Sequence, residues 1–142
     1  MAISVFSVGR DTQLVVIAPS GTMNMAHVTA FDSRQVTQSI QVNRLDVNQL
    51  GIELPKGWEG SFELERGDSV VEDFIAATEQ SFFNGSINTT SSMYQYVSEA
   101  DGSTSTYQYD SVVFRLSNAG IWKGDAAVKQ KLEFFASRRR RI

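Results

Sequence analysis

The chain contains no cysteine, so it has neither a disulfide nor a thiolate that could bind a metal or act as a nucleophile. It has a single histidine, His27, which leaves a catalytic triad or a histidine-rich metal site without the partners that it needs. No apolar run approaches the ~18 residues of a membrane-spanning segment. We therefore expect one domain, residues 1–142, with no catalytic residue, metal, cofactor or membrane span.

Positive charge is scarce outside one short run. Arg138, Arg139, Arg140 and Arg141 are four of the 13 basic residues, which leaves nine basic against 16 acidic residues in the rest of the chain. An acidic body is a poor general binder of nucleic acid. We interpret residues 137–142 as a basic C-terminal tail that pairs with acidic surface on a neighbouring copy. The alternative is a nucleic-acid-binding β-domain that uses these arginines to bind phosphates.

Acidic residues cluster before and within the central helical stretch. Paired carboxylates could perform acid–base chemistry. However, strand alternation and positions near a helix start account for these acids without any chemistry, so we expect no enzyme. The acids concerned are Glu63, Glu65, Asp68, Glu72 and Asp73.

The clearest pattern lies in the middle of the chain. Alternation from Trp58 to Glu65 predicts a half-buried strand, and Gly67 breaks it. A helix over about residues 69–83 follows, with Asp68 or Ser69 as its cap. Ser69 and Glu72 have the spacing of a capping box. One stripe at helical spacing is formed by Val71, Phe74, Ile75, Thr78 and Phe82, with Glu72, Asp73, Glu79 and Gln80 on the other side.

The remaining segments have strand patterns. Asp101-Gly102 predicts a hairpin between the strands Met93–Glu99 and Thr104–Leu116. Its two tyrosine pairs, Tyr94 and Tyr96 against Tyr107 and Tyr109, are expected to lie across from each other. About seven strands and one helix predict a mainly β (α+β) fold, an antiparallel sandwich or barrel with the helix packed on it.

The strand expected at residues 35–43 has an unusual solvent-facing side. Between residues 35 and 43, one side is apolar and the other is polar without any charge, whereas solvated strands usually have Lys or Glu there. The polar row comprises Gln35, Thr37, Ser39, Gln41 and Asn43.

The next segment, at about residues 44–57, is apolar and has no clean period. We interpret it as a long irregular arm that packs on another subunit. The alternative is that it folds back over its own core. Its apolar residues are Leu45, Val47, Leu50, Ile52 and Leu54.

Together these residues resemble a known family. The stretch Gly57–Ser69, G-W-E-G-S-F-E-L-E-R-G-D-S, is followed by the helix start V-E-D-F-I-A-A, and the chain has a closing strand K-L-E-F-F-A-S. In this it resembles the inner tail tube proteins of contractile-tailed bacteriophages, within a superfamily that includes the tubes of type VI secretion systems.

The resemblance implies hexameric rings that stack into a hollow tube inside a sheath. It also implies a virion tail protein, assembled in the host cytoplasm, that delivers the genome through the host envelope. The implied partners are copies of itself, the tail sheath, tape measure, baseplate and tail terminator proteins. A tube of a secretion system is the alternative within this family.

The residues agree with such an assembly. Antiparallel sheets have open edges, and continuing the sheets across subunits into a closed ring removes them. A DNA conduit should not retain phosphates, so the row Gln35–Asn43 suits a lumen through which DNA passes without specific binding. We expect the arm to bind neighbouring copies and Arg138–Arg141 to contact the next ring.

Overall fold

The computed structural model of the chain describes residues 11–18, 21–25, 28–45, 48–85 and 91–142. His27 and Val47 lie outside the described residues. The elements in chain order are β1 (Thr12–Ala18), β2 (Gly21–Asn24), β3 (Val28–Val42), β4 (Leu50–Glu65), α1 (Val70–Phe83), β5 (Ser91–Ser98), β6 (Thr104–Asn118), β7 (Lys129–Ala136) and β8 (Arg138–Arg141).

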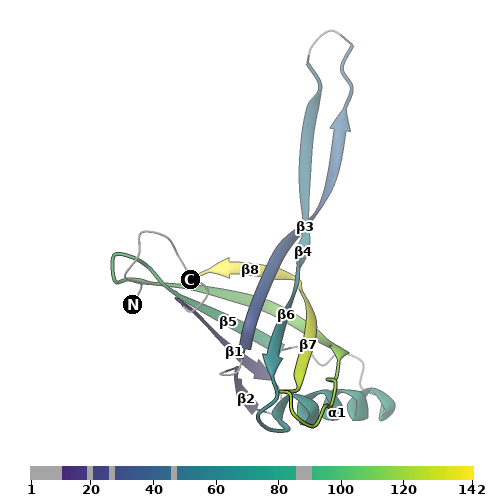
Figure 1. Ribbon diagram of the computed structural model, residues 1–142. Helices are drawn as coiled ribbons and strands as arrows, with labels where there is room; N and C mark the ends of the chain where they lie inside the picture. Colours follow the sequence, from purple (N-terminus) through teal and green to yellow (C-terminus); the bar gives the residue numbers. More distant parts are fainter. Residues whose placement is uncertain (1–10, 19–20, 26–27, 46–47, 86–90) are drawn as a thin grey trace.

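The prediction of a mainly β fold with a single helix is confirmed (Figure 1). All strand pairs are antiparallel, in the order β2-β1-β5-β6-β7-β4-β3, and β8 also pairs with β6. The long strand β6 bends near Ser111, a non-glycine residue with a φ of 52°. Its first half pairs with β5 and β8, and its second half pairs with β7.

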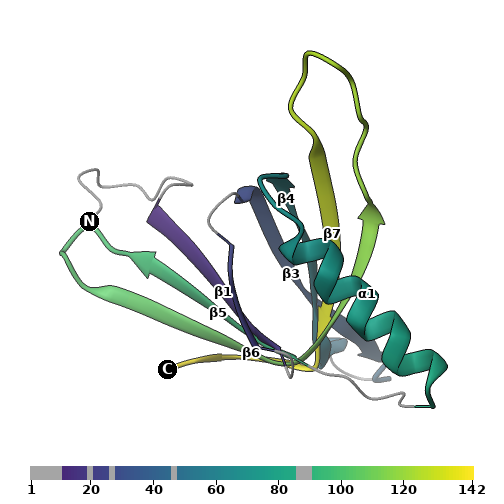
Figure 2. The ribbon, with the colours of Figure 1, turned by 90° about the horizontal axis from the view of Figure 1, so that it is seen from below.

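The bend divides the strands into two layers, as at the corner of an orthogonally packed sandwich. Sheet A contains β2, β1, β5, the first half of β6, and β8. Sheet B contains the second half of β6, β7, β4 and β3. Seen from below, the two layers diverge from the bend and α1 lies across sheet B (Figure 2).

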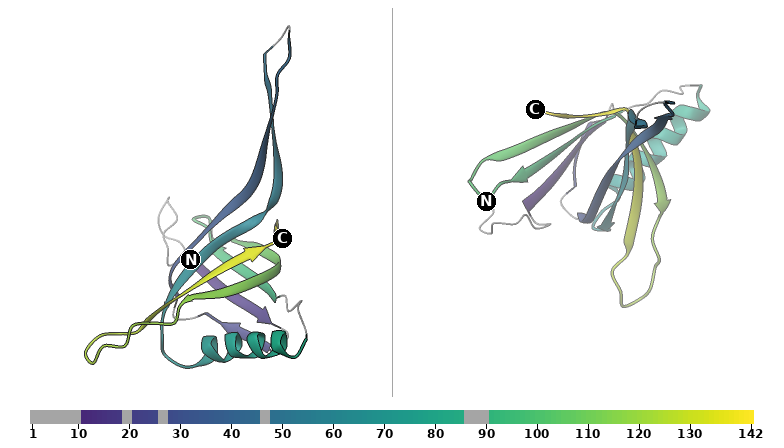
Figure 3. Two further views of the ribbon diagram at one scale, coloured as in Figure 1. Left: turned by 90° about the vertical axis from the view of Figure 1, so that its right-hand side faces the viewer. Right: turned by 90° about the horizontal axis from the view of Figure 1, so that it is seen from above.

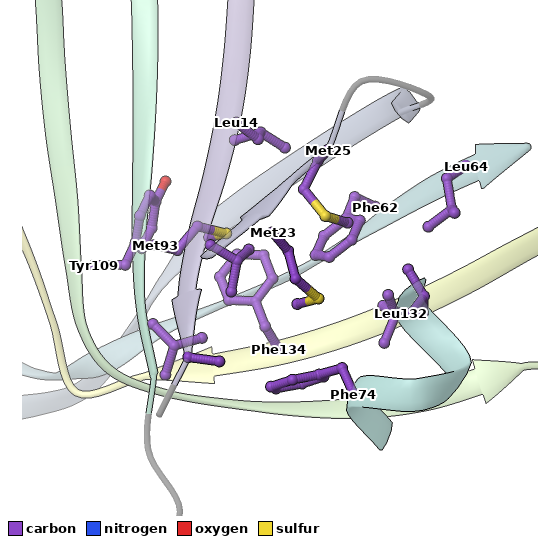
Figure 4. Close-up of a cluster of buried hydrophobic side chains, with 14 of the residues drawn as sticks. Leu14, Met23, Met25, Phe62, Leu64, Phe74, Met93, Tyr109, Leu132 and Phe134 are labelled. Atoms are coloured by element: carbon purple, nitrogen blue, oxygen red, sulfur yellow. The ribbon is translucent and has the colours of Figure 1, made fainter. Parts of the chain in front are cut away.

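The core lies between these layers (Figure 4). Phe74 of α1 reaches it and stacks edge-on against Phe114 at 5.6 Å, and Phe114 contacts Phe62 in the same way at 6.1 Å. The hydroxyl of buried Tyr109 donates to Ser33 Oγ at 3.1 Å, which joins the two sheets. The largest fully buried side chains are Val16, Phe62, Met93, Tyr109, Val112 and Gln130.

The predicted helix is found at Val70–Phe83, but its N-terminus is not a capping box. Asp68 Oδ1 accepts a hydrogen bond from the Val70 N–H at 3.2 Å. Ser69 Oγ donates to Asp73 Oδ2 at 3.0 Å and makes no side-chain cap bond. Of the two expected caps, Asp68 therefore makes the side-chain hydrogen bond and Ser69 does not.

Glu72, the other expected member of the box, binds two side chains outside the helix. It forms an ion pair with Arg66 and accepts a hydrogen bond from buried Gln130 Nε2 at 2.9 Å. The bond from Arg66, followed by that from Gln130, lowers the pKa of Glu72. This acid therefore fixes the start of α1 to β7.

The hairpin at Asp101-Gly102 is present, but its register differs from the expected one. Tyr107 pairs with Gln95, and Tyr109 pairs with Met93. Because a one-residue slip turns a side chain to the opposite face, the tyrosines of β5 point away from the core and those of β6 point into it. The prediction that the two pairs meet across the hairpin is wrong.

The segment predicted as an irregular arm is one side of a long hairpin. Strands β3 and β4 remain paired out to Val42 and Leu50, far beyond the body of the molecule (Figures 1 and 3). All described residues from Thr37 to Lys56 are exposed, and we call them the arm. The prediction of a segment without secondary structure is wrong, and so is the alternative that it covers its own core.

A bulge marks the root of the arm. The pairing of β3 with β4 shifts between Val36 and Thr37, opposite Lys56 and Gly57. Gly57 has a φ of 133°, and a Cβ there would lie 2.7 Å from both the Phe135 ring and the Ala136 carbonyl oxygen. Only glycine suits this position, so the point where the hairpin leaves the body is built into the sequence.

Candidate assembly surfaces

The arm has one apolar face that no other described part of the chain covers. Its cross-strand pairs place Ile40 opposite Ile52 and Val42 opposite Leu50, with Leu54 on the same side. Each of these five side chains is exposed by 37–49%, and Leu45 at the tip is fully exposed. Exposed apolar surface of this extent marks a contact site.

The opposite face of the arm is polar. Thr37 and Ser39 donate hydrogen bonds to the Glu53 carboxylate at 2.8 and 2.6 Å. The predicted polar row is therefore found on one face of β3, but β4 adds an acid to it. Within that row, Gln41 pairs with Gly51 and Gln35 pairs with Trp58 at the root. Asn43 lies just beyond the last pair.

These hydrogen bonds lower the pKa of Glu53, first through Ser39 and then through Thr37. Their stabilisation of the arm is present above the unfolded pKa and lost as pH falls through the lower folded pKa. Replacing both Ser39 and Thr37 with alanine is expected to raise the pKa of Glu53, measured by carboxyl ¹³C titration. Asp101, whose pKa is lowered by Ser103, is the internal control. An unchanged pKa of Glu53 in the double variant would show that these two hydrogen bonds do not lower it.

Sheet A has an outer face almost without charge. On its strands, positions that alternate with buried core residues point away from sheet B. Among the described strand residues of this face, the charged ones are Asp110, Arg138 and Arg140, at the edge formed by β8. The uncharged positions are Gln13, Val15, Ile17, Thr22, Ser92, Tyr94, Tyr96, Ser98, Thr104, Thr106 and Gln108.

The outer face of sheet B, in contrast, has many charged residues of both signs. Arg34 forms ion pairs with Asp32 and Glu59, and Arg115 forms one with Glu133. The charged residues of this face are Asp32, Arg34, Glu59, Glu63, Glu65, Arg115, Lys129, Lys131 and Glu133. The two outer faces are thus chemically distinct.

The four C-terminal arginines form strand β8 and not a tail. Arg138 to Arg141 pair with Tyr107–Asp110 of β6. Arg140 binds the Asp110 carboxylate through two nitrogens, at 2.7 and 3.2 Å, and Arg141 donates to Ser105 Oγ at 3.2 Å. The acid that the run was expected to find on a neighbour is found within the chain.

Arg139 lies in an aromatic cage. Its guanidinium carbon is 3.8 Å from the centre of the Tyr107 ring, 4.7 Å from that of Trp58 and 5.7 Å from that of Tyr109. Trp58 comes from sheet B, so the cage closes the gap between the sheets beside the root of the arm. Sequence reasoning missed this site, because its members are distant in the chain and only the register of β8 unites them.

Replacing Arg139 with alanine is expected to reduce the free energy of unfolding by about 1–2 kcal/mol, because a partly desolvated cation–π contact is lost. Arg139→Lys should lose less, since it keeps the charge but not the planar stacking. Arg138→Ala, at an exposed position of the same strand, is the control and should change little. Urea unfolding followed by circular dichroism measures all three, and equal losses from Arg138→Ala and Arg139→Ala would contradict the cage.

Sheet A ends in two short strands. Within the described residues, no strand pairs with the outer edge of β2 or of β8. Free edges expose backbone hydrogen-bonding groups that favour the addition of a further strand.

Neither a metal site nor a membrane-crossing helix is found in the part of the chain that the structure describes. No group of three or more His, Cys, Asp or Glu residues there could hold an ion. The described helix is too short and too polar to cross a bilayer.

Comparison with solved structures identifies the fold. The chain matches the anti-feeding prophage cap (tube terminating cap) with a TM-score of 0.64 and 8% identity, covering 100% of this chain and 94% of that one. It matches the sheath/tube terminator of the PVC extracellular contractile injection system with a TM-score of 0.62 and 10% identity, covering 100% of this chain and 97% of that one. A chain of the sheath–tube complex of that system matches with a TM-score of 0.59 and 10% identity, covering 92% of this chain and 88% of that one.

At these identities the likeness concerns the fold. The chain has the fold of proteins found in contractile injection particles, which confirms at this level the resemblance to tail tube proteins. No family model and no curated protein matches the chain by sequence.

Proposed function

We propose that this chain is a structural protein, without enzymatic activity, that forms hexameric rings stacked into the inner tube of a contractile tail. The observation that supports this most is the arm, a paired hairpin whose apolar face is left exposed by the residues that the structure describes. An isolated monomer would keep that face in water. An assembly of copies would bury it.

Ring closure would use sheet A. Its two free edges, β2 and β8, lie at opposite sides of the sheet, so the edge of one copy can add to the other edge of the next. A head-to-tail contact of this kind closes into a ring when its rotation is a simple fraction of a turn. The sheets of six copies would then form one continuous wall.

The outer face of sheet A would line the bore. A conduit for DNA must not hold phosphates, and each free Lys or Arg on its wall would add salt-dependent affinity. This face offers mostly hydroxyl, amide, aliphatic and aromatic groups. At its β8 edge Asp110 neutralises Arg140, so Arg138 is the one cation of this face without a described partner. The polar row Gln35, Thr37, Ser39, Gln41 and Asn43 would continue the lining along the arm.

The remaining partners are those that the resemblance implies. A sheath outside, a tape measure protein within the lumen, and baseplate and terminator proteins at the ends would contact the tube, in a virion tail assembled in the host cytoplasm. The neighbours in fold come from a sheath–tube complex, a terminator and a cap, which supports such surroundings. Because two of the three come from an extracellular injection system, a tube that carries cargo other than a genome is the second candidate.

The nucleic-acid-binding alternative has less support. Three of the four terminal arginines are held within the chain, by Asp110, by Ser105 and by the aromatic cage. Only Arg138 presents an exposed guanidinium without a described partner to a passing phosphate.

Native mass spectrometry of the purified protein tests ring formation. We expect a species with the mass of six 15.8-kDa copies and, at higher concentration, multiples of it. Only the monomer mass at every concentration would contradict the proposal.

The bore assignment has its own test. Gln13→Lys, at an exposed position on the outer face of sheet A, should place a ring of six positive charges inside the tube. A small anionic gold cluster should then bind with an affinity that falls with salt, and cryo-electron microscopy should locate it on the tube axis. The control Gln80→Lys, on the exposed side of α1, should place the label outside or nowhere. Gold on the outer wall of the Gln13→Lys tube would contradict the assignment.

A further inference from the structure

The aromatic cage of Arg139 lies at the root of the arm. Trp58, the member of the cage that comes from β4, directly follows Gly57, where the pairing of β3 with β4 is shifted and the arm begins. Strand β8 starts beside β4 at this point (Figure 1). Arg139 therefore connects the last strand of the chain to the strand from which the arm extends.

The link between β7 and β8 lies beside the same root. Trp58 pairs with Ala136 at the end of β7. The next residue, Ser137, donates from its N–H and its hydroxyl to the Asp110 carbonyl oxygen, at 3.0 and 3.1 Å. A movement of β8 about Ser137 would therefore remove Arg139 from Trp58 and leave the pairing of β7 intact.

Strand β8 is a part of sheet A that should open easily. It has four residues, and no described strand pairs with its outer edge. Local opening of a short edge strand costs much less free energy than unfolding of the whole domain. A strand that adds to this edge binds only the closed form of β8, so it shifts the equilibrium toward that form.

The cage holds Arg139 by ring faces and leaves one of its donors unpaired. The Arg139 Nε is buried, and no described group accepts a hydrogen bond from it. A buried donor without a partner costs free energy, which offsets part of the cation–π attraction. Arg140, in contrast, binds the Asp110 carboxylate through two nitrogens. The closed position of Arg139 is therefore less stable than its aromatic contacts alone would make it.

We propose that Arg139 is a positioning residue for the arm, and that it couples the direction of the arm to the occupation of the β8 edge. With β8 closed, the guanidinium packs on Trp58 and fixes the strand at the root of the arm. With β8 open, Trp58 loses this contact and the arm turns about the bulge at Gly57.

The coupling to assembly rests on the proposed ring closure, because the strand that would cover the β8 edge belongs to the next copy in the ring. Ring closure would keep β8 closed and Arg139 in its cage. A closed ring would then hold its arms in one direction, and a free subunit would not.

The absence of cysteine allows two spin labels to be placed at chosen sites. Gln41→Cys on the polar face of the arm and Ala77→Cys on α1 both replace exposed side chains. The distance between the two labels reports the direction of the arm. Pulsed electron–electron double resonance measures its distribution in the dilute monomer, and in rings that contain one labelled copy among many unlabelled ones. Circular dichroism shows whether each variant is folded.

In the monomer, Arg139→Ala should broaden the distribution about twofold, because the root of the arm loses its contact with β8. Trp58→Leu removes the other side of the same contact and should have the same effect. Arg138→Ala, at an exposed position of β8, is the matched control and should change nothing. On ring formation the distribution should narrow in the protein that keeps Arg139 and stay broad in Arg139→Ala.

An unchanged distribution in Arg139→Ala, or equal broadening in Arg138→Ala, would overturn the positioning role. Arg139→Lys, which loses the planar stacking, replaces Arg139→Ala if that variant does not fold, with the same two outcomes. A distribution as broad in rings as in the monomer would overturn the coupling. Absence of rings from the wild type would instead refute the tube function, while the monomer measurements would still decide the role of Arg139.

Discussion

Replacing Gly60 with valine is expected to reduce the free energy of unfolding by about 3 kcal/mol or more, a large part of the total for a domain of this size. A Cβ at Gly60 would lie 2.1 Å from the Asp32 carbonyl oxygen and 2.8 Å from Ser33 Cα. Both are backbone atoms of β3, fixed by pairing of Ser33 with Gly60, so no side-chain movement relieves the contact. Urea unfolding followed by circular dichroism measures the loss.

Gly51→Ala is the matched control, since it lies on the same strand and no atom comes within 4 Å of its added Cβ. We expect a change within about 0.5 kcal/mol. If Gly60→Val were as stable as Gly51→Ala, β3 and β4 would not be in the close contact described here. The arm would then lose its anchor, because the same two strands form both the wall of the core and the arm.

Shortening the arm should abolish assembly while the domain still folds. In the proposed variant the two residues Asn-Gly replace residues 38–54 and form the turn between Thr37 and Pro55. These two residues face each other across the hairpin. Every described residue removed is exposed, so the core is untouched. The midpoint of urea unfolding should stay close to that of the wild type.

Size-exclusion chromatography and electron microscopy then report assembly. We expect no tube at concentrations where the wild type forms long ones, because each ring loses the apolar surface that reaches its neighbour. Long tubes from the shortened chain would show that the arm has no part in stacking. An unfolded variant would show that the arm supports the core, contrary to its exposure.

The sequence predicts local features of this fold well. The helix was expected at about residues 69–83 and is found at Val70–Phe83, because an amphipathic stripe and acids near the start agree there. The turn at Asp101-Gly102 is found as predicted, since few other dipeptides suit it. These signals lie within a few residues of each other and depend little on the rest of the chain.

Features that depend on pairing between distant strands were predicted poorly. Leu50, Ile52 and Leu54 alternate as in a strand. Gly51 and Pro55 made this two-residue period hard to recognise, because both residues are uncommon inside strands. The arm is seen to be a hairpin only once its pairing with β3 is known. The uncharged face of sheet A went unnoticed, because it is assembled from strands between residues 12 and 141. A register one residue away would have placed other side chains on it.

Cryo-electron microscopy of the assembled wild-type protein tests the central claim most directly. The account predicts hollow six-fold rings in which sheet A surrounds the channel and the apolar face of each arm is covered by a neighbouring copy. It is contradicted by particles that remain monomeric at every concentration, or by rings whose channel is lined by the charged outer face of sheet B.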